Sequence, residues 1–411
     1  MEDVAGLKPS ELAKIRSRLV DFAAEMFEPM ERSDQRRWGE VYLRGLMLNG
    51  KRKSIEPIAA RLEDGDEQCL QQFVNQSPWG WDAVRERLAR RMSEEIEPAA
   101  WIVDDTGFPK FGRHSVGVAR QYCGALGKVS NCQLGVSVSA ATDEAPCPLD
   151  WRIYLPEEWA QDEERRRKAG VPEELSHEPK WKLCLEIIDE LRAWGLEAPP
   201  VLGDAAYGDV TEFRSGLEER GLSYVLDAKA DTSAYSEMVR PARPDYAGTG
   251  RPPKPRYRQK PSSLSELALA AGETEAREVC WRESSDGAKL SSRFVRLRVR
   301  PANVKLRNRA SREGRELPVC WLLCEWPEGE PEPTAYWLSN LAEDTTLEQL
   351  VSLAKLRWRI EHDYRELKDA LGLDHFEGRS YRGWHHHVTL VSVAHGFLTL
   401  ERRNPKVPAA A

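Results

Sequence analysis

Acidic residues end two short apolar runs of this sequence, where their carboxylates could bind metal ions. Asp105 follows the run AWIVD, and Asp204 follows PPVLG. Both fall at the carboxyl ends of predicted strands, and open α/β sheets bind their ligands at that edge. Small or turn-forming residues follow both acids, so a ligand can approach closely. A single acid in this setting can equally form a turn or cap a helix, so the informative pattern is two such positions in succession.

A third acid, Glu361, lies in a predicted helix that runs from about Thr346 to Leu371. At about 100° per residue, Arg357, Glu361 and Lys368 lie within about 40° of one another on such a helix. An adjoining apolar stripe would anchor the helix on a sheet, and its residues are Ile360, Tyr364, Leu367 and Leu371. The same spacing also suits an exposed helix with ordinary ion pairs between its turns.

Together, the segments WIVDDTGFPKFGRHSVGV, VLGDAAYGD and RWRIEHDYRELK resemble the DDE transposases of the IS701 group, relatives of the IS4-type transposases. In the larger family the third motif is Tyr, two residues, Arg, three residues, Glu, six residues and Lys. The chain matches this motif at Arg357, Glu361 and Lys368. It departs at Ala354, which stands in place of the Tyr and removes one expected contact with a transposon-end phosphate. The resemblance covers roughly residues 35 to 400.

The resemblance implies a catalytic metal site. In relatives the first-motif Asp precedes a Thr, so Asp105 is predicted rather than Asp104. Two Mg²⁺ ions, with Mn²⁺ as a substitute, are expected: Asp105 would bridge both, Asp204 would bind one and Glu361 the other. Two such ions about 3.5–4 Å apart stabilise both the attacking and the leaving oxygen of phosphodiester cleavage.

The resemblance further implies a transposase that binds the terminal inverted repeats of an insertion sequence and catalyses strand cleavage and strand transfer. Its expected partners are double-stranded DNA, from the terminal repeats and the target, and a second copy of the chain in a synaptic complex. Arg357 and Lys368 would bind DNA phosphates next to the cut. Two alternatives stay open: an RNase H-like nuclease or resolvase, and a domesticated, non-catalytic DNA-binding protein.

Positive charge is concentrated in two segments, although the net charge of the chain is −7. Residues 240–260 contain seven Lys or Arg and one Asp, and residues 289–315 contain ten Lys or Arg and one Glu. A protein that binds a polyanion locally while its other surfaces are acidic has this pattern; a solvated basic loop has it too. The residues predicted to bind DNA here are Arg251, Lys254, Arg256, Arg258, Lys260, Arg307 and Arg309.

The surrounding elements predict an α/β fold with an RNase H-like catalytic core, a mixed sheet, an N-terminal helical domain and a β-rich insertion. The predicted domains are a helical DNA-binding domain at 1–98, the first part of the core at 99–229, the basic insertion at 230–340, the second part of the core at 341–400 and a tail at 401–411. No apolar stretch is long enough for a membrane helix, and a location in the bacterial cytoplasm, with the nucleoid, is expected.

Several further residues have two readings each. His385, His386 and His387 are consecutive, so on a helix they point about 100° apart and do not form one ligand set; we expect a surface or DNA-facing cluster. Trp337 is expected to be a buried strand residue, with stacking on an unpaired base as the alternative. The segment after the first motif, with Lys110, Arg113 and His114, either lines a DNA channel or is plain surface. The scattered cysteines are expected to be free, buried thiols.

Overall fold

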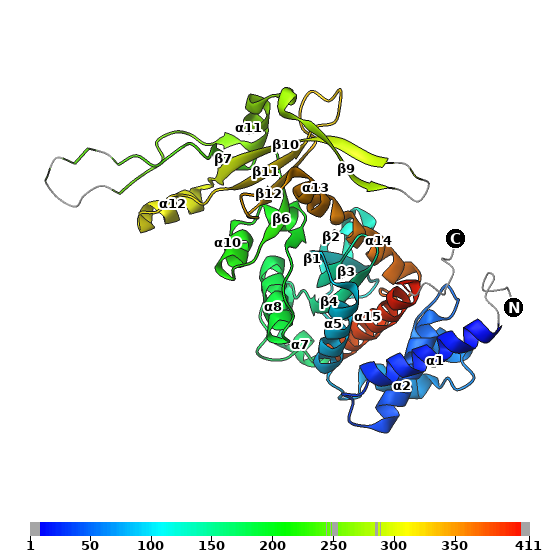
Figure 1. Cartoon of the computed structure of the whole chain (residues 1–411). Coiled ribbons are helices and arrows are strands. Elements are labelled where there is room, and N and C mark those ends of the chain that lie inside the picture. The colour runs from blue at the N-terminus through cyan, green and yellow to red at the C-terminus, as the bar shows by residue number, and fades with distance from the viewer. Residues whose placement is uncertain are drawn as a thin grey trace. The chain divides into compact units, whose positions relative to one another are not determined.

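The computed structural model of the chain describes residues 9–243, 245–246, 248, 254–283, 287 and 289–403. The chain forms two compact units, Met1–Ala198 with Trp358–Ala411, and Pro199–Arg357. Figure 1 shows the helices and strands of both, coloured along the chain. In the described part of the chain, no helix is long and apolar enough to cross a membrane.

The first unit begins with helices, as predicted for the N-terminal region: α1 (Pro9–Met26), α2 (Ser33–Met47), α3 (Ile55–Arg61), α4 (Glu67–Asn75) and α5 (Trp81–Ile96). Their apolar side chains recur at helical spacing and are buried, for example Leu19, Phe22, Ala23 and Met26 of α1. Most of these helices pack against the last helix of the unit, α15 (Tyr381–Arg403).

An antiparallel sheet follows in the same unit, with β1 (Ala100–Pro109), β2 (Ala119–Cys123), β3 (Lys128–Ala141) and β4 (Pro146–Ile153). The long strand β3 pairs with β1 along one edge, and with β2 and then β4 along the other. Further helices complete the unit: α6 (Glu157–Ala160), α7 (Glu163–Ala169), α8 (Lys180–Ala193) and α14 (Trp358–Asp369). Both α8 and α14 pack on the sheet.

The three consecutive histidines of α15 are buried, so the predicted surface cluster was wrong. His386 stacks on the Trp79 ring with 3.7 Å between ring centroids, and its ring nitrogens lie 2.8 and 3.0 Å from the Val74 and Trp79 carbonyl oxygens. His387 Nδ1 lies 2.9 Å from the Tyr42 hydroxyl. Burial lowers the pKa of His386 to about 3 and that of His387 to about 4. The physical reason is that α1, α2, α4, α5 and β4 all contact α15, which leaves most of this helix without a solvent face.

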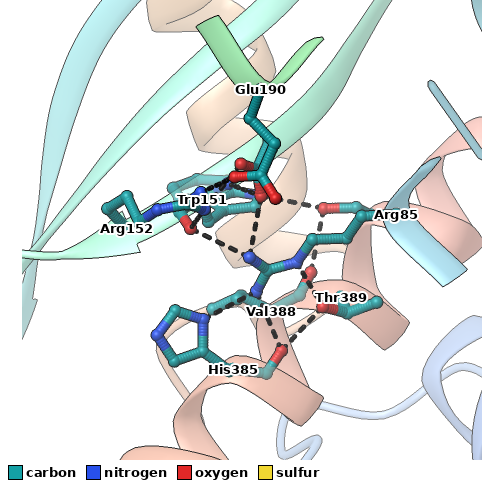
Figure 2. Close-up of polar contacts among 9 residues, drawn as sticks. Arg85, Trp151, Arg152, Glu190, His385, Val388 and Thr389 are labelled. Atoms are coloured by element: carbon teal, nitrogen blue, oxygen red, sulfur yellow. Dashed lines mark hydrogen bonds and ion pairs between the residues drawn. The ribbon is translucent and has the colours of Figure 1, made fainter. Parts of the chain in front are cut away.

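A buried ion pair joins α5, β4 and α15 (Figure 2). Arg85, 1% exposed, donates to partners on both neighbouring elements: Asp150 Oδ1 at 2.8 Å, Trp151 O at 2.9 Å, Thr389 Oγ1 at 2.7 Å and His385 Nδ1 at 2.9 Å. Arg152 binds the other Asp150 oxygen at 2.6 Å and also pairs with Glu190 of α8. The network therefore fastens helices from both ends of the chain to the edge strand of the sheet.

The second unit contains a mixed sheet. Strands β5 (Val201–Gly203) and β6 (Tyr224–Ala228) are parallel, and the helices α9 (Ala205–Gly208) and α10 (Thr211–Glu219) connect them. The strand order continues β5-β6-β12-β11-β10-β7-β8 with antiparallel pairs from β6 onwards, and β9 pairs with β10. The remaining strands are β7 (Ser233–Ser236), β8 (Ser262–Ser263), β9 (Arg277–Glu283), β10 (Lys289–Pro301), β11 (Cys320–Glu325) and β12 (Ala335–Ser339).

The strand-like runs predicted at REVCWRE, FVRLRVR, LPVCWLLCEW and AYWLSNL are therefore confirmed as β9 to β12. Two helices also lie in this region, α11 (Leu264–Ala271) and α12 (Val304–Glu313), and the prediction missed both. The signals for α12 were local: the Asn303 side chain caps its start, and Gly314, with φ 69°, ends it.

The single helix predicted from Thr346 to Leu371 is divided into α13 (Leu347–Leu356) and α14. The start was correct, because Thr346 and Gln349 form a capping box. The backbone N–H of Arg357 donates to Lys355 O, not to the carbonyl oxygen four residues earlier. The regular α-helical hydrogen-bond pattern is therefore interrupted at this residue. This residue is also the last of the second unit. The predicted apolar stripe of α14 is buried: Ile360, Tyr364 and Leu367.

Candidate functional site

The two aspartates of the first motif lie side by side in the middle of β1, not at its carboxyl end as predicted, and they face opposite sides of the sheet. Asp104 is directly opposite Ser137 of β3, and Asp105 is opposite Val136. Residues that are directly opposite share a face, whereas consecutive residues alternate. The Ser137 hydroxyl lies 2.7 Å from the Tyr364 hydroxyl of α14. Asp104 therefore shares the face that α14 covers, and Asp105 points to the other face.

Electrostatics on α14 agree with this placement. Burial raises the pKa of Tyr364 well above its usual value, and the negative charge of Asp104 and, to a smaller extent, that of Asp105 raise it further. Lys368 Nζ donates to Gly107 O of β1 at 2.9 Å, so this lysine fastens α14 to the strand. Glu361 precedes Tyr364 by three residues, lies on the neighbouring turn of the helix and is exposed. Glu361 and Asp104 thus belong to the same side of the first unit.

Asp105 forms an ion pair on its own face. Its Oδ1 lies 2.8 Å from Nζ of Lys180, the first residue of α8, and the two side chains are 16% and 35% exposed. A metal ion at this carboxylate would have to compete with the ammonium group. The strand alternation that separates the two aspartates was readable in the sequence, but the identity of the helix on each face was not.

The second motif lies in the other unit, at the end of β5. Asp204 caps the short helix α9, and its Oδ1 accepts a hydrogen bond from Ala206 N at 2.9 Å. Gly203 is opposite Leu226 in the parallel pair of β5 and β6. The next carboxylate on β6, Asp227, is therefore near Asp204 at the carboxyl ends of neighbouring strands.

Asp227 was missed by the sequence reasoning. Its carboxylate lies 3.2 Å from Nε of Arg357, and it is directly opposite Trp337 of β12. Burial raises the pKa of Asp227 to about 6, with Arg357 and Trp337 opposing the shift and Asp204 adding to it. Trp337 is buried, as predicted. The signal was the run LSYVLDA, a second strand that ends in an acid just as PPVLGD does.

The predicted DNA-binding residues of the second unit fall into two groups. Arg256, Arg258 and Lys260 are exposed and form no ion pair with any acid in the described part of the chain. Lys254 donates from Nζ to Arg312 O, and Arg251 lies outside the described residues. On helix α12, Lys305 pairs with Glu212 at 2.6 Å, and Arg309 pairs with Glu219 at 3.1 Å and with Glu313 at 3.3 Å, whereas Arg307 forms no ion pair within the described residues.

The donors of the first motif and of Glu361 are carboxylate oxygens, which suit hard cations such as Mg²⁺ or Mn²⁺. In the described part of the first unit, no three His, Cys, Asp or Glu side chains gather closely enough to hold a metal ion. All eight cysteines are free thiols, and six are buried; Cys69 is partly exposed and Cys280 is exposed. The expectation of free thiols is confirmed, and the expectation that they are buried holds for those six.

Comparisons with known proteins agree with the sequence motifs. The profile of the family described as DDE superfamily endonuclease matches residues 25–288, and that of the transposase DDE domain matches residues 181–397. A probable transposase for insertion sequence element IS701, from Microchaete diplosiphon, is 24% identical over 340 residues, which are 82% of this chain and 75% of the relative. The chain is also similar to a piggyBac transposase solved as a synaptic complex with hairpin DNA, with a TM-score of 0.39, 10% identity, and coverage of 96% of this chain and 80% of that chain.

The first profile alone spans more than half of the chain, and the two profiles together span all three acidic motifs. The resemblance to the IS701 group is thus confirmed, as is the predicted α/β fold class with a mixed sheet. Transposase DDE domains generally use divalent metal ions. The chain belongs to the DDE superfamily of endonucleases and is a transposase.

Proposed function

We propose that this transposase binds the terminal inverted repeats of an insertion sequence, cleaves the DNA strands at their ends and transfers the freed ends to target DNA. The observation that carries this proposal is the face of β1 that α14 covers, because it associates a first-motif carboxylate with Glu361. Such a role on chromosomal DNA would associate the protein with the bacterial nucleoid.

The proposed catalytic carboxylates are those of the first motif, Asp204 and Glu361. Two Mg²⁺ ions, or Mn²⁺ in their place, would supply an activated water and stabilise the leaving 3′-oxygen when bound. The protein's own part is to hold the carboxylates within strand β1, at the end of β5 and on the packed helix α14. Arg357 is the proposed phosphate ligand, and its guanidinium fork suits two phosphate oxygens. The ion pair with Asp227 orients that fork before DNA binds.

The first-motif ligand can be either Asp104 or Asp105. The family motif selects Asp105, the residue before Thr106. The contacts favour Asp104, because it shares a face with Tyr364 of α14, whereas Asp105 pairs with Lys180 at 2.8 Å. We therefore propose Asp104 as the metal ligand and Asp105 as the residue that fixes α8 on β1. The alternative, in which Asp105 is the metal ligand, is tested directly below.

The test uses the purified full chain and duplexes that carry the inverted repeats read from the DNA that flanks its gene. Asp204→Asn and Glu361→Gln are expected to bind the duplex as the wild type does and to abolish cleavage in Mg²⁺ and Mn²⁺. Asp104→Asn should behave in the same way. Asp105→Asn should keep measurable cleavage, and so should its matched control Lys180→Met, because both remove the same ion pair.

Each result has a defined meaning. If Asp105→Asn is inactive while Asp104→Asn and Lys180→Met cut normally, Asp105 is the ligand. Cleavage without strand transfer by the wild type would indicate a nuclease or resolvase, and binding without cleavage would indicate a non-catalytic DNA-binding protein. If Glu361→Gln cuts at the wild-type rate, the assignment of α14 to the catalytic site is wrong. Sedimentation of the protein with and without repeat DNA would test the proposed homodimer in the synaptic complex.

A further inference from the structure

The segment that follows the first motif contains no acidic residue. Residues 106–142 include neither Asp nor Glu, in a chain that has 67 of them, and they include Lys110, Arg113, Arg120 and Lys128. Arg113, Arg120 and Lys128 are exposed, and none of them forms an ion pair within the described residues. This acid-free segment is therefore a locally positive surface on the unit that holds the first motif.

Apolar side chains are exposed on the same segment. Phe111 is fully exposed, and Tyr122 and Val129 are 63% and 52% exposed. Tyr122 and Val129 are directly opposite each other on β2 and β3, so they share a face. Leu126, in the connection between these strands, is 45% exposed. Exposed apolar side chains grouped in this way usually mark an interaction surface.

The loop that carries Phe111 is fastened on both sides of that residue. Asn131 of β3 donates from Nδ2 to Lys110 O at 2.6 Å and to Gly112 O at 2.9 Å. Lys110 N donates to Asn131 O at 3.0 Å, and Arg165 donates to Arg113 O at 2.9 Å. Because the backbone on either side is held, the Phe111 side chain is directed to solvent from an ordered loop, so binding would not have to pay for ordering that backbone.

The position relative to the first motif is set by the chain itself. Asp105 and Phe111 are six residues apart, with β1 extending to Pro109 between them, so at about 3.3 Å per residue the two lie within about 20 Å. Asn131, which holds the loop, is opposite Arg120 on β2 and shares its face with Val129. The Phe111 loop and the exposed hairpin face are therefore continuous.

An exposed aromatic ring on a segment that carries cations without ion-pair partners and has no acid of its own matches the chemistry of an opened nucleic acid. Bases stack on aromatic rings with little sequence preference, and Lys or Arg side chains bind the flanking phosphates. We propose that Phe111 stacks on an unpaired base of bound DNA, while Arg113 and Arg120 bind phosphates on either side. This proposal rests on the DNA-binding function proposed above and adds a DNA contact surface to it.

The test measures binding of the full chain to two DNA duplexes. They have the same sequence, except that one is fully paired and the other contains a single unpaired 2-aminopurine. The wild type is expected to bind the second duplex about 10-fold more tightly and to quench its fluorescence. Phe111→Ala should bind both duplexes equally and lose the quenching, whereas Phe111→Trp should keep both properties. The matched control is Val20→Ala, which truncates an exposed apolar side chain on α1.

The combined Arg113→Ala and Arg120→Ala variant should weaken binding to both duplexes and flatten the slope of log affinity against log salt by about 0.9 per lost contact. If Phe111→Ala quenches and discriminates as the wild type does, the inference is wrong even though the protein still cuts DNA. If the wild type binds neither duplex, the proposed DNA-binding function itself fails. Loss of self-association in Phe111→Ala, with unchanged DNA binding, would assign the surface to a second copy of the chain and overturn the proposal.

Discussion

Replacing Arg85 by Met would test whether the buried ion pair of Figure 2 fixes the N-terminal helices to the sheet of β1 to β4. The Arg85 and Asp150 side chains are 1% and 0% exposed. The substitution keeps most of the aliphatic volume, removes every guanidinium contact, and leaves Asp150 buried with only Arg152 at 2.6 Å and the Trp151 N–H at 2.7 Å as hydrogen-bond donors.

Breaking one partner of a buried pair typically costs about 3–5 kcal/mol, because the remaining charge is left in a poorly polarisable environment. Arg152 still neutralises part of the Asp150 charge, so the expected loss in the free energy of unfolding is about 3 kcal/mol, the lower end of that range. Whole domains are stable by only about 5–15 kcal/mol. A loss of this size would therefore be visible as a lower urea midpoint.

The assay is urea unfolding at pH 7, followed by tryptophan fluorescence and far-ultraviolet circular dichroism. Arg90→Met is the matched control, because Arg90 lies on the same helix and pairs with Glu86 in an exposed bridge, with side chains 51% and 36% exposed. Its expected cost is below about 0.5 kcal/mol. Combining Arg85→Met with Asp150→Leu should recover much of the loss, since no buried charge then lacks its partner. An Arg85→Met cost as small as that of Arg90→Met would refute this reasoning.

Three further predictions concern the second unit. Arg357→Ala should weaken complex formation with the terminal repeats and slow cleavage in a way that added Mg²⁺ does not reverse, and Arg357→Lys should be nearly as harmful because an ammonium group does not reproduce the fork; wild-type values for both would contradict the phosphate role. Burial raises the pKa of Asp227 to about 6, so the folded state keeps its proton longer than the unfolded state. The unfolding free energy of the wild type, compared with Asp227→Asn, should then fall by up to about 3 kcal/mol as the pH rises from about 4 to about 6, and a constant difference across that range would argue against the burial effect. In salt titrations of DNA binding, neutralising the loop residues Arg256, Arg258 and Lys260 should flatten the slope by about 0.9 per lost phosphate contact, whereas neutralising α12 at Lys305 and Arg309 should change it less, because those cations pair with acids; equal effects would show that the ion pairs open on DNA.

Much of the local structure was predictable, because its causes lie within a few residues of each other. The alternation in CQLGVSVSA predicted a strand, and the capping pair Thr346 and Gln349 marked the start of α13. The apolar runs followed by acids indicated Asp204 and the first motif as candidate site residues. The same rule, applied once more to LSYVLDA, would have identified Asp227. The order of the three acidic motifs was enough to indicate the family.

Other properties depend on residues that are distant in the sequence, and the amino-acid order near each site does not specify them. The faces of Asp104 and Asp105 became distinguishable only through Ser137 of β3 and Tyr364 of α14. Spacing predicted an exposed histidine cluster on α15, but helices and a strand from the first half of the chain surround it. The sequence did not show that the cations of α12 have acidic partners. In the structure, Lys305 and Arg309 pair with Glu212 and Glu219 of α10.

The sequence by itself thus determined the family, the main strands and helices, and which residue types could perform the chemistry, because backbone propensity and side-chain periodicity act over one or two turns. Only the tertiary structure decided which carboxylate faces α14, which histidines are buried and neutral, and which cations keep an exposed charge. Burial and ion pairing are properties of the space around a side chain, and that space is formed by segments far apart in the sequence, such as those of Tyr42 and His387, which are 345 residues apart.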